Sequence, residues 1–551
     1  MIGFGQGSRS VEWEQRRIAP VYGNQGMVAS AHPLVTTTGL EVLQHGGNAV
    51  DAAIAAAVTA AVVMPEMCGL GGDLFAIVHE PNSGETLSFL GSGISPRGSS
   101  IEEMRLAGTK GNMPFRGPLA VGVPGMVDAY FSMLNRFGTR SFSEVAERGT
   151  VYAEHGHPLS MACAGYITEY RELLSSFESS AAVFLAGGAS PKAGDLLKQV
   201  DLGRTLRSIA QHGPDIFYRG DIGRQIISAM QANGGSMSLS DFADHVTDVV
   251  APISTTYREH TIYQTGLPSQ GMIMLEHLNL IEASGVTPAD ADAAWLHLLV
   301  EAKKIAYADR IGYARDAAFG STPMTTLLSK EWAKSRATSI DPDRAATDVP
   351  AGPHADGDTT YLCVIDANGM MVSLIQSVSA AFGCGMVAGE TGVVLNNRVG
   401  RGFSLEDGHP NIFEPGKKTM HTLNCFLIAN PEGIPVLVGG TPGGDGQPQW
   451  NTQMITGMLD YDLDVQATID APRWTSWPGT DPSTLPNSFE LRMEDRIGPE
   501  IIAGLEKLGH SVVQQQAWDG GGAGQIIARD PTTGLIAGGT DPRVEGLVAG
   551  F

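Results

Sequence analysis

Side chains that could do chemistry gather in one short segment of this 551-residue chain. His354, Asp356 and Asp358 could be metal ligands, while Thr359 and Thr360 offer hydroxyl groups directly before a predicted strand. Polar residues at a spacing of two in a loop are more typical of a solvated turn, and no H-E-x-x-H motif accompanies them. Threonine also suits a pleated strand by itself. We therefore expect no metal ion here, and the hydroxyl pair has to be judged with the rest of the chain.

Other catalytic signatures are absent or incomplete in the sequence. The glycines of 3–7 and 383–385 lack the G-x-G-x-x-G setting between a strand and a helix, so a dinucleotide site is not expected. The chain has no G-x-x-x-x-G-K-[ST] phosphate loop and no G-x-S-x-G elbow of a serine triad. We expect no cofactor.

The composition is that of an acidic globular protein. With 36 Lys and Arg against 59 Asp and Glu, the formal net charge of −23 argues against nucleic acid or an anionic membrane as a partner. A hydrophobic content of 42% excludes a disordered chain. The five cysteines are widely spaced without a C-x-x-C pair, so we expect buried, inert thiols.

Two observations bear on location. The first 20 residues contain no apolar stretch typical of a secretory signal. The longest apolar run, 52–64, is shorter than the roughly 20 residues that cross a bilayer. The expected location is cytoplasmic.

The predicted elements change in character along the chain. The first half is predicted to be mainly helical, with Asn48 or Asp51 capping an alanine-rich helix and 293–309 forming a helix with one buried face. Strands are predicted at 359–366 and 370–375, joined by an Asn-Gly turn, and at 392–397, 423–429 and 434–438. A helix is predicted over 447–459, after a glycine-rich turn. We therefore expect one domain in which the strands form layers between the helices.

Several ordered segments together resemble one family. They are Gly46-Gly-Asn-Ala-Val-Asp-Ala-Ala53, Cys68-Gly-Leu-Gly-Gly-Asp73, Val121-Gly-Val-Pro-Gly125, Phe217-Tyr-Arg-Gly220, Ala388-Gly-Glu-Thr-Gly392, Leu395-Asn-Asn397, Pro442-Gly-Gly444 and Thr540-Asp-Pro-Arg543. With the Thr359-Thr360 pair, they resemble the γ-glutamyltranspeptidase family of N-terminal-nucleophile hydrolases over 26–551, and most closely its oxamate amidohydrolase and cephalosporin-acylase-like branch. The resemblance implies an α+β, four-layer αββα sandwich with two antiparallel sheets between helical layers.

The resemblance also implies that the chain is made as a precursor that cuts itself between Asp358 and Thr359. The products would be a large fragment, 1–358, and a small catalytic fragment, 359–551, associated as a heterodimer that could pair further into a homodimer. An N-terminal threonine carries an α-amino group with a pKa of about 7.7–8.0, close enough to neutral for it to accept the proton of the Thr359 hydroxyl.

Three further residues match the family's catalytic positions. Ser377 falls where a second hydroxyl side chain hydrogen-bonds the nucleophile. Gly443 and Gly444 match the glycines whose backbone N–H groups hold the oxyanion. The plain alternative for these glycines is a turn that begins a helix.

The positions that hold substrate depart from the γ-glutamyl enzymes. Where those enzymes have acidic residues for an α-ammonium group, this chain follows Asn397 with Arg398 and Arg401. Ser379 replaces an asparagine, and His421-Thr422 replaces a pair of serines. Arginine favours a carboxylate and repels an ammonium group. The alternative is that both arginines pair with Glu406 and Asp407 on a surface loop.

The expected substrate is therefore a small amide whose acyl group bears a carboxylate but no α-amine, such as an oxamate, succinyl or glutaryl amide. Three alternatives remain open from the sequence: a true γ-glutamyltransferase or glutathione hydrolase, an uncut member that serves as a binding protein, and a zinc or serine hydrolase.

Overall fold

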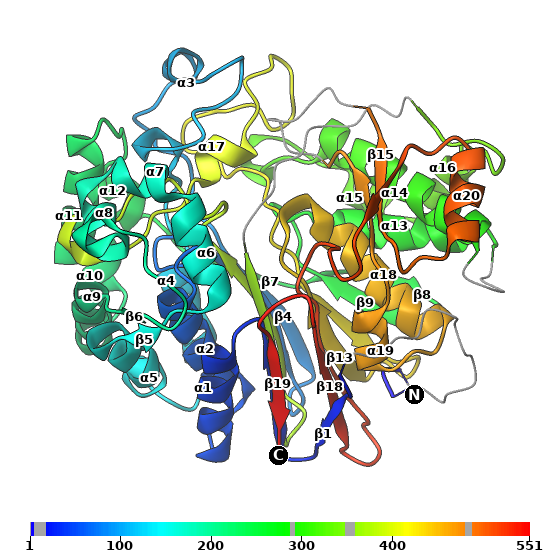
Figure 1. Ribbon diagram of the computed structural model, residues 1–551, viewed down its shortest axis with the longest axis horizontal. Helices are drawn as coiled ribbons and strands as arrows, with labels where there is room; N and C mark the ends of the chain where they lie inside the picture. The colour runs from blue at the N-terminus through cyan, green and yellow to red at the C-terminus, as the bar shows by residue number, and fades with distance from the viewer. Residues whose placement is uncertain (1, 5–17, 287–291, 348–358, 480–487) are drawn as a thin grey trace.

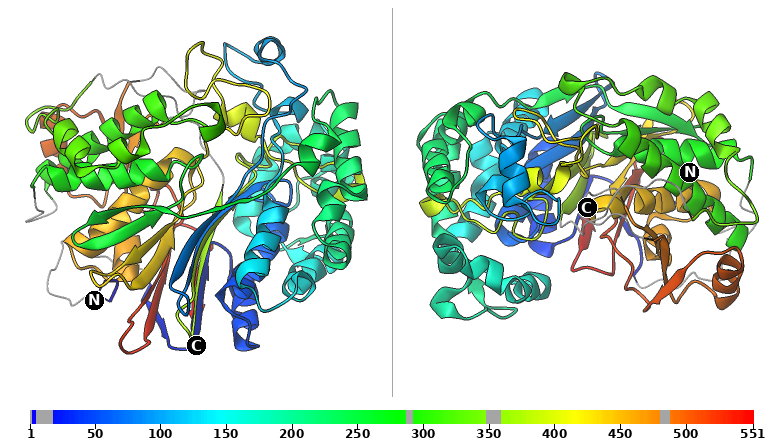
Figure 2. Two further views of the ribbon diagram at one scale, coloured as in Figure 1. Left: turned by 180° about the vertical axis from the view of Figure 1, so that it is seen from behind. Right: turned by 90° about the horizontal axis from the view of Figure 1, so that it is seen from above.

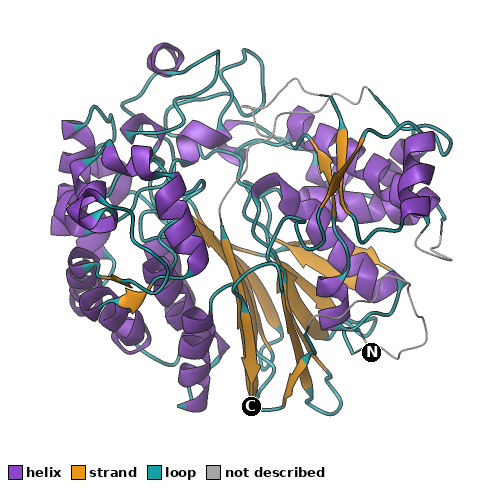
Figure 3. Cartoon of the chain, in the orientation of Figure 1, coloured by secondary structure: helices purple, strands orange, loops and turns teal. Residues whose placement is uncertain are grey.

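Two seven-stranded antiparallel sheets lie face to face at the centre of the computed structural model, which describes residues 2–4, 18–286, 292–347, 359–479 and 488–551 (Figures 1 and 3). The first sheet has the order β19 (Leu547–Gly550), β2 (Gly26–Ser30), β10 (Thr360–Asp366), β11 (Met371–Ser377), β3 (Asp73–Glu80), β4 (Glu85–Gly91), β7 (Asp248–Val250). The second has the order β1 (Val21–Gly23), β18 (Ile536–Thr540), β17 (Gln525–Arg529), β13 (Pro435–Gly440), β12 (Phe426–Ala429), β9 (His260–Gln264), β8 (Ile253–Tyr257).

The two sheets share an apolar core. Tyr361 and Ile375 from the first sheet pack in one cluster with Leu427, Val438 and Ile527 from the second, and all five side chains are fully buried. Strands buried on both faces need nearly continuous apolar sequence, which explains why β10 and β11 are buried along their whole length.

Helices cover the outer face of each sheet (Figure 2). Contacts with the first sheet come from α1 (Pro33–Gln44), α2 (Ala49–Val63) and α4 (Met126–Phe137), with α5 (Phe142–His155) and α9 (Val200–His212) outside them. Contacts with the second sheet come from α13 (Gly271–Ala283), α18 (Gln447–Asp460) and α19 (Val465–Asp470), and α14 (Ala293–Tyr313) packs on α13. The predicted α+β architecture with two antiparallel sheets between helical layers is confirmed.

Shorter elements complete the described structure. The remaining helices are α3 (Ile101–Ala107), α6 (Met161–Glu169), α7 (Arg171–Ser175), α8 (Glu178–Phe184), α10 (Asp215–Tyr218), α11 (Asp221–Ala232), α12 (Leu239–Ala243), α15 (Met324–Leu327), α16 (Lys330–Ala337), α17 (Arg398–Gly402) and α20 (Pro499–Lys507). Two small sheets join β5 (His157–Pro158) with β6 (Leu196–Leu197), and β14 (Trp474–Trp477), β15 (Glu490–Glu494) with β16 (Val512–Gln515).

The alanine-rich helix begins where its capping residues predict. The Asn48 side chain accepts from the Asp51 backbone N–H, and the Asp51 side chain accepts from the Asn48 N–H, which forms a capping box. Every residue of α2 is buried, because small side chains let the helix lie between the sheet and α5.

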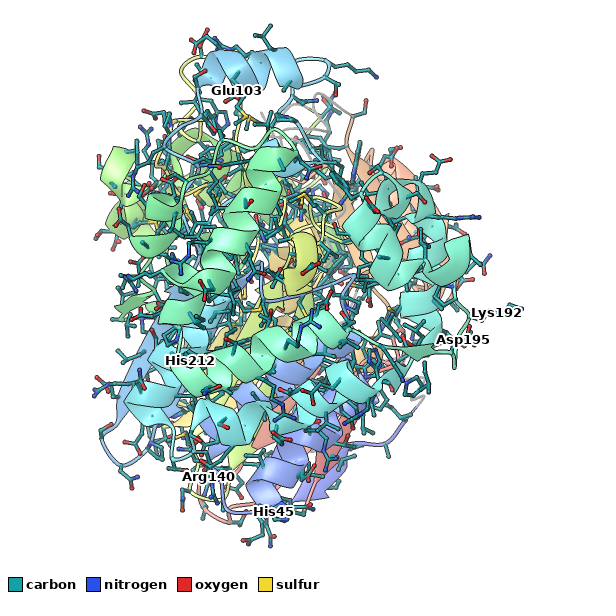
Figure 4. All side chains as sticks on the ribbon, turned by 90° about the vertical axis from the view of Figure 1, so that its left-hand side faces the viewer. His45, Glu103, Arg140, Lys192, Asp195 and His212 are labelled. Carbon is teal, nitrogen blue, oxygen red and sulfur yellow. The ribbon has the colours of Figure 1, made fainter. Side chains whose placement is uncertain are left out.

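The helical layer that covers the first sheet has a polar outer surface. Figure 4 looks onto this side, and the labelled side chains of His45, Arg140, Lys192, Asp195 and His212 lie on its exposed surface. Arg140 donates to the His45 carbonyl, and Asp195 accepts from the Lys192 N–H. Among the described helices, none has both the length and the apolar character that a membrane crossing requires.

Two of the predicted strands need correction. Residues 392–397 form no strand but two isolated bridges, from Val394 to Val387 and from Leu395 to Gly71, because neighbouring residues pair with two different segments and no ladder continues. The strand predicted from 423 begins only at Phe426. The helix over 447–459 is confirmed as α18, and all five cysteines are free and buried, as predicted.

Candidate active site

The β10–β11 hairpin brings Thr359 next to Ser377. Thr360 pairs with Gln376 across the hairpin, so Thr359, one residue earlier, reaches Ser377 at the same end of the sheet. Thr359 Oγ1 donates to Ser377 Oγ at 3.2 Å. Ser377 Oγ also accepts from the backbone N–H of Ser379 at 2.7 Å. Both hydroxyl side chains are buried, so their geometry is defined by the protein and not by solvent.

The backbone after Ser377 is strained. Ser379 has a φ of +89°, a conformation that side chains other than glycine rarely adopt. This turn points the Ser379 N–H at the Ser377 hydroxyl and the Ser379 carbonyl at Arg401. The strain is therefore located where the chain turns to bring the hydroxyl pair and an arginine together.

Gly443 and Gly444 form the turn between β13 and α18. Both have positive φ values, 119° and 53°, which glycine adopts without steric cost. A Cβ atom built on Gly443 would lie 2.2 Å from the ring of Trp450, so a larger residue is excluded. The predicted turn at the start of a helix is present, and it lines the same cavity as Thr359 through Gly443.

Buried polar side chains donate hydrogen bonds to the backbone carbonyls of this turn. Gln270 Nε2 donates to the Gly444 carbonyl at 2.9 Å and to the Thr422 carbonyl at 2.7 Å. Tyr307 donates its hydroxyl to the Asp445 carbonyl, and Arg310 Nη1 lies 3.4 Å from Asp445 Oδ1. Tyr307 and Arg310 stand three residues apart on α14 and therefore on one face of the helix.

Arg398 and Arg401 are both buried on α17. Arg398 Nε lies 3.2 Å from Asp73 Oδ2, and Arg401 Nη1 donates to the Ser379 carbonyl at 2.7 Å. Asp407 instead pairs with Arg105 on the exposed surface at 2.6 Å. The alternative that the two arginines belong to a solvated loop is therefore wrong.

Asp73 lies beside the hydroxyl pair, since it pairs with Ser377 across β11 and β3. Burial alone would raise the pKa of the Asp73 carboxyl, but the neighbouring His421 and Arg398 hold that pKa below its usual value. His421 Nε2 lies 3.3 Å from Asp73 Oδ2. Burial, with Arg398 nearby, lowers the pKa of His421 to about 4, so this imidazole is neutral at pH 7. We therefore ascribe the ionised state of Asp73 chiefly to Arg398.

Two other predicted residues have different surroundings. Asn397 accepts from the Ala380 N–H at 3.0 Å and donates to the Phe115 carbonyl at 3.1 Å, so its side chain ties two loops together. Thr422 lines a cavity with Arg398 and Arg401.

Two cavities flank this constellation and share no lining residue. The smaller, about 30 Å³, is lined by three arginines, Arg310, Arg398 and Arg401, together with Thr422 and Asp445 among others. The larger, about 840 Å³, is lined by Thr359, Pro442 and Gly443, by apolar side chains such as Met64 and Met67, and by the charged residues Glu66, Arg543 and Glu545. A hydroxyl therefore stands at the wall of a ligand-sized cavity, with a cationic cavity nearby.

Comparison with known proteins identifies the family. The γ-glutamyltranspeptidase family model matches residues 35–551. The chain belongs to this family. It is 37% identical over 535 residues to the glutathione hydrolase-like YwrD proenzyme of Bacillus subtilis, covering 96% of this chain and 99% of that protein. It is 34% identical over 536 residues to the oxamate amidohydrolase proenzyme of Klebsiella pneumoniae, covering 96% and 98%.

A solved structure of the family has the same fold. The cephalosporin acylase of Bacillus halodurans superimposes with a TM-score of 0.90 at 32% identity, covering 100% of this chain and 99% of that one. As a member of the family, this chain is an enzyme of the hydrolase and acyltransferase class.

Sequence reasoning missed Asp73, Gln270, Tyr307 and Arg310 as members of the site. Asp73 ends the Cys68–Asp73 family segment, but nothing in the sequence indicates that it meets Arg398, 325 positions away. Arg310 and Asp445 are likewise 135 positions apart. Asp358, His354 and Asp356 lie outside the described residues.

Among the described residues, the side chains of His297, Glu301 and His510 lie close enough together to hold a metal ion. Its groups already have partners: the two imidazoles contact each other at 2.8 Å, and Glu301 accepts from Lys304 at 2.7 Å. Because Lys304 places a positive charge against the carboxylate, we interpret this cluster as structural.

Proposed function

We propose that this protein is an amidohydrolase that cuts its own chain between Asp358 and Thr359 and then uses Thr359 as an N-terminal nucleophile. The observation that supports it most is the 3.2 Å contact between the Thr359 and Ser377 hydroxyls, at the wall of a cavity that Thr359 and Gly443 line. Cleavage would give fragments 1–358 and 359–551. β10 of the second fragment pairs with β2 of the first, and β11 pairs with β3, so the fragments would remain one folded unit.

The proposed reaction runs through an acyl-enzyme. The free α-amino group of Thr359 accepts the proton of its own hydroxyl, and the oxygen attacks the amide carbonyl. Backbone N–H groups of Gly443 and Gly444 would bind the oxyanion, a contribution worth about 10²–10³ in rate for each donor. The amine leaves with a proton, and water then hydrolyses the ester to release the acid and restore the hydroxyl.

The acyl group is proposed to carry a carboxylate and no α-amine. Three arginines line the small cavity, with one carboxylate, Asp445, among its lining residues. Two of them are joined to the neighbourhood of the nucleophile, Arg401 through the Ser379 carbonyl and Arg398 through Asp73. Guanidinium groups bind carboxylates through paired hydrogen bonds and would repel an ammonium group. The small volume favours a short acyl group, so oxamate-like amides are preferred over succinyl and glutaryl amides.

The first test is intact mass spectrometry of the wild-type protein and of Thr359→Ala. The wild type should yield a fragment whose sequence begins Thr-Thr-Tyr-Leu, and the variant should remain a single 58.0 kDa chain without amidase activity. An uncut wild-type chain that hydrolyses amides would refute the proposal.

A glutathione hydrolase is the second candidate, favoured by the name of the YwrD relative at 37% identity. The two candidates differ in the α-amine of the substrate. Glutaryl-p-nitroanilide and γ-glutamyl-p-nitroanilide differ only in that group, so faster cleavage of the γ-glutamyl compound would favour the second candidate. A folded wild type that neither cuts itself nor hydrolyses any amide would indicate a binding protein.

A further inference from the structure

The larger cavity beside Thr359 has no assigned ligand. Resting on the proposed function, we infer that it receives the leaving amine of the substrate, and that this amine is large, apolar and not anionic. The inference concerns the half of the amide that the arginines do not bind.

The position of the cavity gives the first step of the argument. An amide carbon attacked by Thr359 carries its acyl chain on one side and its amine on the other. The arginine-lined cavity and the larger cavity have no residue in common, and only the larger one is lined by Thr359 and Gly443. If the arginines of the smaller cavity hold the acyl carboxylate, the larger cavity remains available for the amine.

The lining of the cavity gives the second step. Met64, Met67, Met161, Tyr166 and Val544 supply apolar side chains to its wall. Methionine adapts its shape to different apolar ligands. A volume of about 840 Å³ lies in the range of sites for drug-sized ligands, far more than ammonia would fill.

The charges on the wall give the third step. Glu66 and Glu545 line the cavity together with one arginine, Arg543. Arg543 is already bound to two carboxylates, at 2.7 Å from Glu494 and 3.1 Å from Asp541. Glu545 is fixed at the start of α6, where it accepts from the Met161 N–H at 2.8 Å. A carboxylate on the amine would meet these glutamates in a partly desolvated space, which costs binding energy.

The test is a series of amides with one acyl group and four amines. The acyl group is oxalyl or glutaryl, whichever the processed enzyme hydrolyses faster, and the amines are ammonia, methylamine, hexylamine and 6-aminohexanoate. The three alkylamines are of similar basicity, so differences among them report binding. We expect kcat/KM for the hexyl amide to exceed that for the methyl amide by about 100-fold, since each buried methylene contributes. The carboxylated chain should fall at least about tenfold below the hexyl amide.

Two variants connect the result to the cavity. Met161 is 76% exposed and lines the cavity, so Met161→Glu should lower kcat/KM for the hexyl amide about tenfold relative to the methyl amide. Leu106→Glu is the matched control, because Leu106 is 88% exposed and does not line the cavity. Glu545→Gln should raise kcat/KM for the carboxylated amide relative to the hexyl amide.

The outcomes separate this inference from the function on which it rests. Equal kcat/KM for methyl and hexyl amides, or faster cleavage of the carboxylated amide, on an enzyme that forms the Thr359 fragment would overturn the inference alone. Failure of the proposed function would show as absence of that fragment, or as no turnover of any amide in the series.

Discussion

At the scale of single residues, the Thr359 hydroxyl depends on its contact with Ser377, which in turn is oriented by the Ser379 N–H. Replacing Ser377 with alanine removes a buried partner of the nucleophile. We expect kcat of Ser377→Ala to fall about tenfold, the value of one hydrogen bond. The measurement is the rate of amide hydrolysis by fully processed protein.

Ser377→Thr is the control for that change, because it keeps the hydroxyl. It should restore most of the activity lost in Ser377→Ala. If both variants lose activity equally, packing at this position matters and the hydroxyl does not.

A second residue-scale expectation concerns stability. Arg398 and Asp73 are 3% and 1% exposed, so removing one charge leaves the other buried without its strongest partner. Arg398→Met should lower the free energy of unfolding by about 3 kcal/mol. The double variant Arg398→Met, Asp73→Asn should recover part of that loss in denaturant unfolding. A single variant as stable as the wild type would show that His421 alone sustains the Asp73 charge.

At the scale of elements, α14 supports the turn that carries Gly443 and Gly444. Tyr307 donates its hydroxyl to the Asp445 carbonyl from a fully buried position. Tyr307→Phe should lower kcat about tenfold with little change in KM, because it loosens the turn without touching either cavity. Tyr313→Phe, on the same helix but 38% exposed, should leave both constants unchanged. Equal effects of the two variants would rule out a role of α14 in the turn.

Local patterns predicted the elements well where neighbours in sequence are neighbours in space. The Asn48 cap, the β10–β11 hairpin with its turn at Gly369, and α18 all depend on residues a few positions apart. The strand prediction for 392–397 was wrong because the partners of this segment, Gly71 and Val387, are determined by tertiary packing and not by β-propensity.

The candidate site divides in the same way. Thr359, Ser377 and the two glycines are recognisable from motifs, and the structure brings Thr359 and Ser377 into contact and Thr359 and Gly443 to one cavity. Asp73 and Arg310 were missed because a charge partner far away in the chain leaves no periodic signal. The arginines were found, but only the structure distinguishes a buried pair from a solvated loop.

At the scale of the whole molecule, buried histidines make stability depend on pH. Burial lowers the pKa of five of them to about 4 and of one to about 3: His32, His157, His245, His277, His421 and His510. In the unfolded chain each would titrate near 6.5. Between pH 6.5 and 4 the unfolded state binds more protons, so the free energy of unfolding falls as the pH falls.

The check is urea unfolding at pH 8, 6.5 and 5. The wild type should lose stability mainly below pH 6.5. His157→Gln removes one of these groups. Between pH 8 and 5, the free energy of unfolding of this variant should therefore fall by about 2 kcal/mol less than that of the wild type. An identical pH dependence in the variant would mean that His157 is not buried as a neutral group.

The packing of Trp450 against three glycines has an optical consequence. A Cβ atom on Gly443, Gly446 or Gly521 would lie 2.2 to 2.3 Å from the indole ring, so the ring rests directly on backbone, and its Nε1 donates to Thr475 Oγ1 at 3.0 Å. Indole emission follows the polarity and fields around the ring. A charge that forms and decays on the Gly443 turn during each turnover would thus modulate the fluorescence of Trp450, giving stopped-flow experiments a native reporter that needs no label.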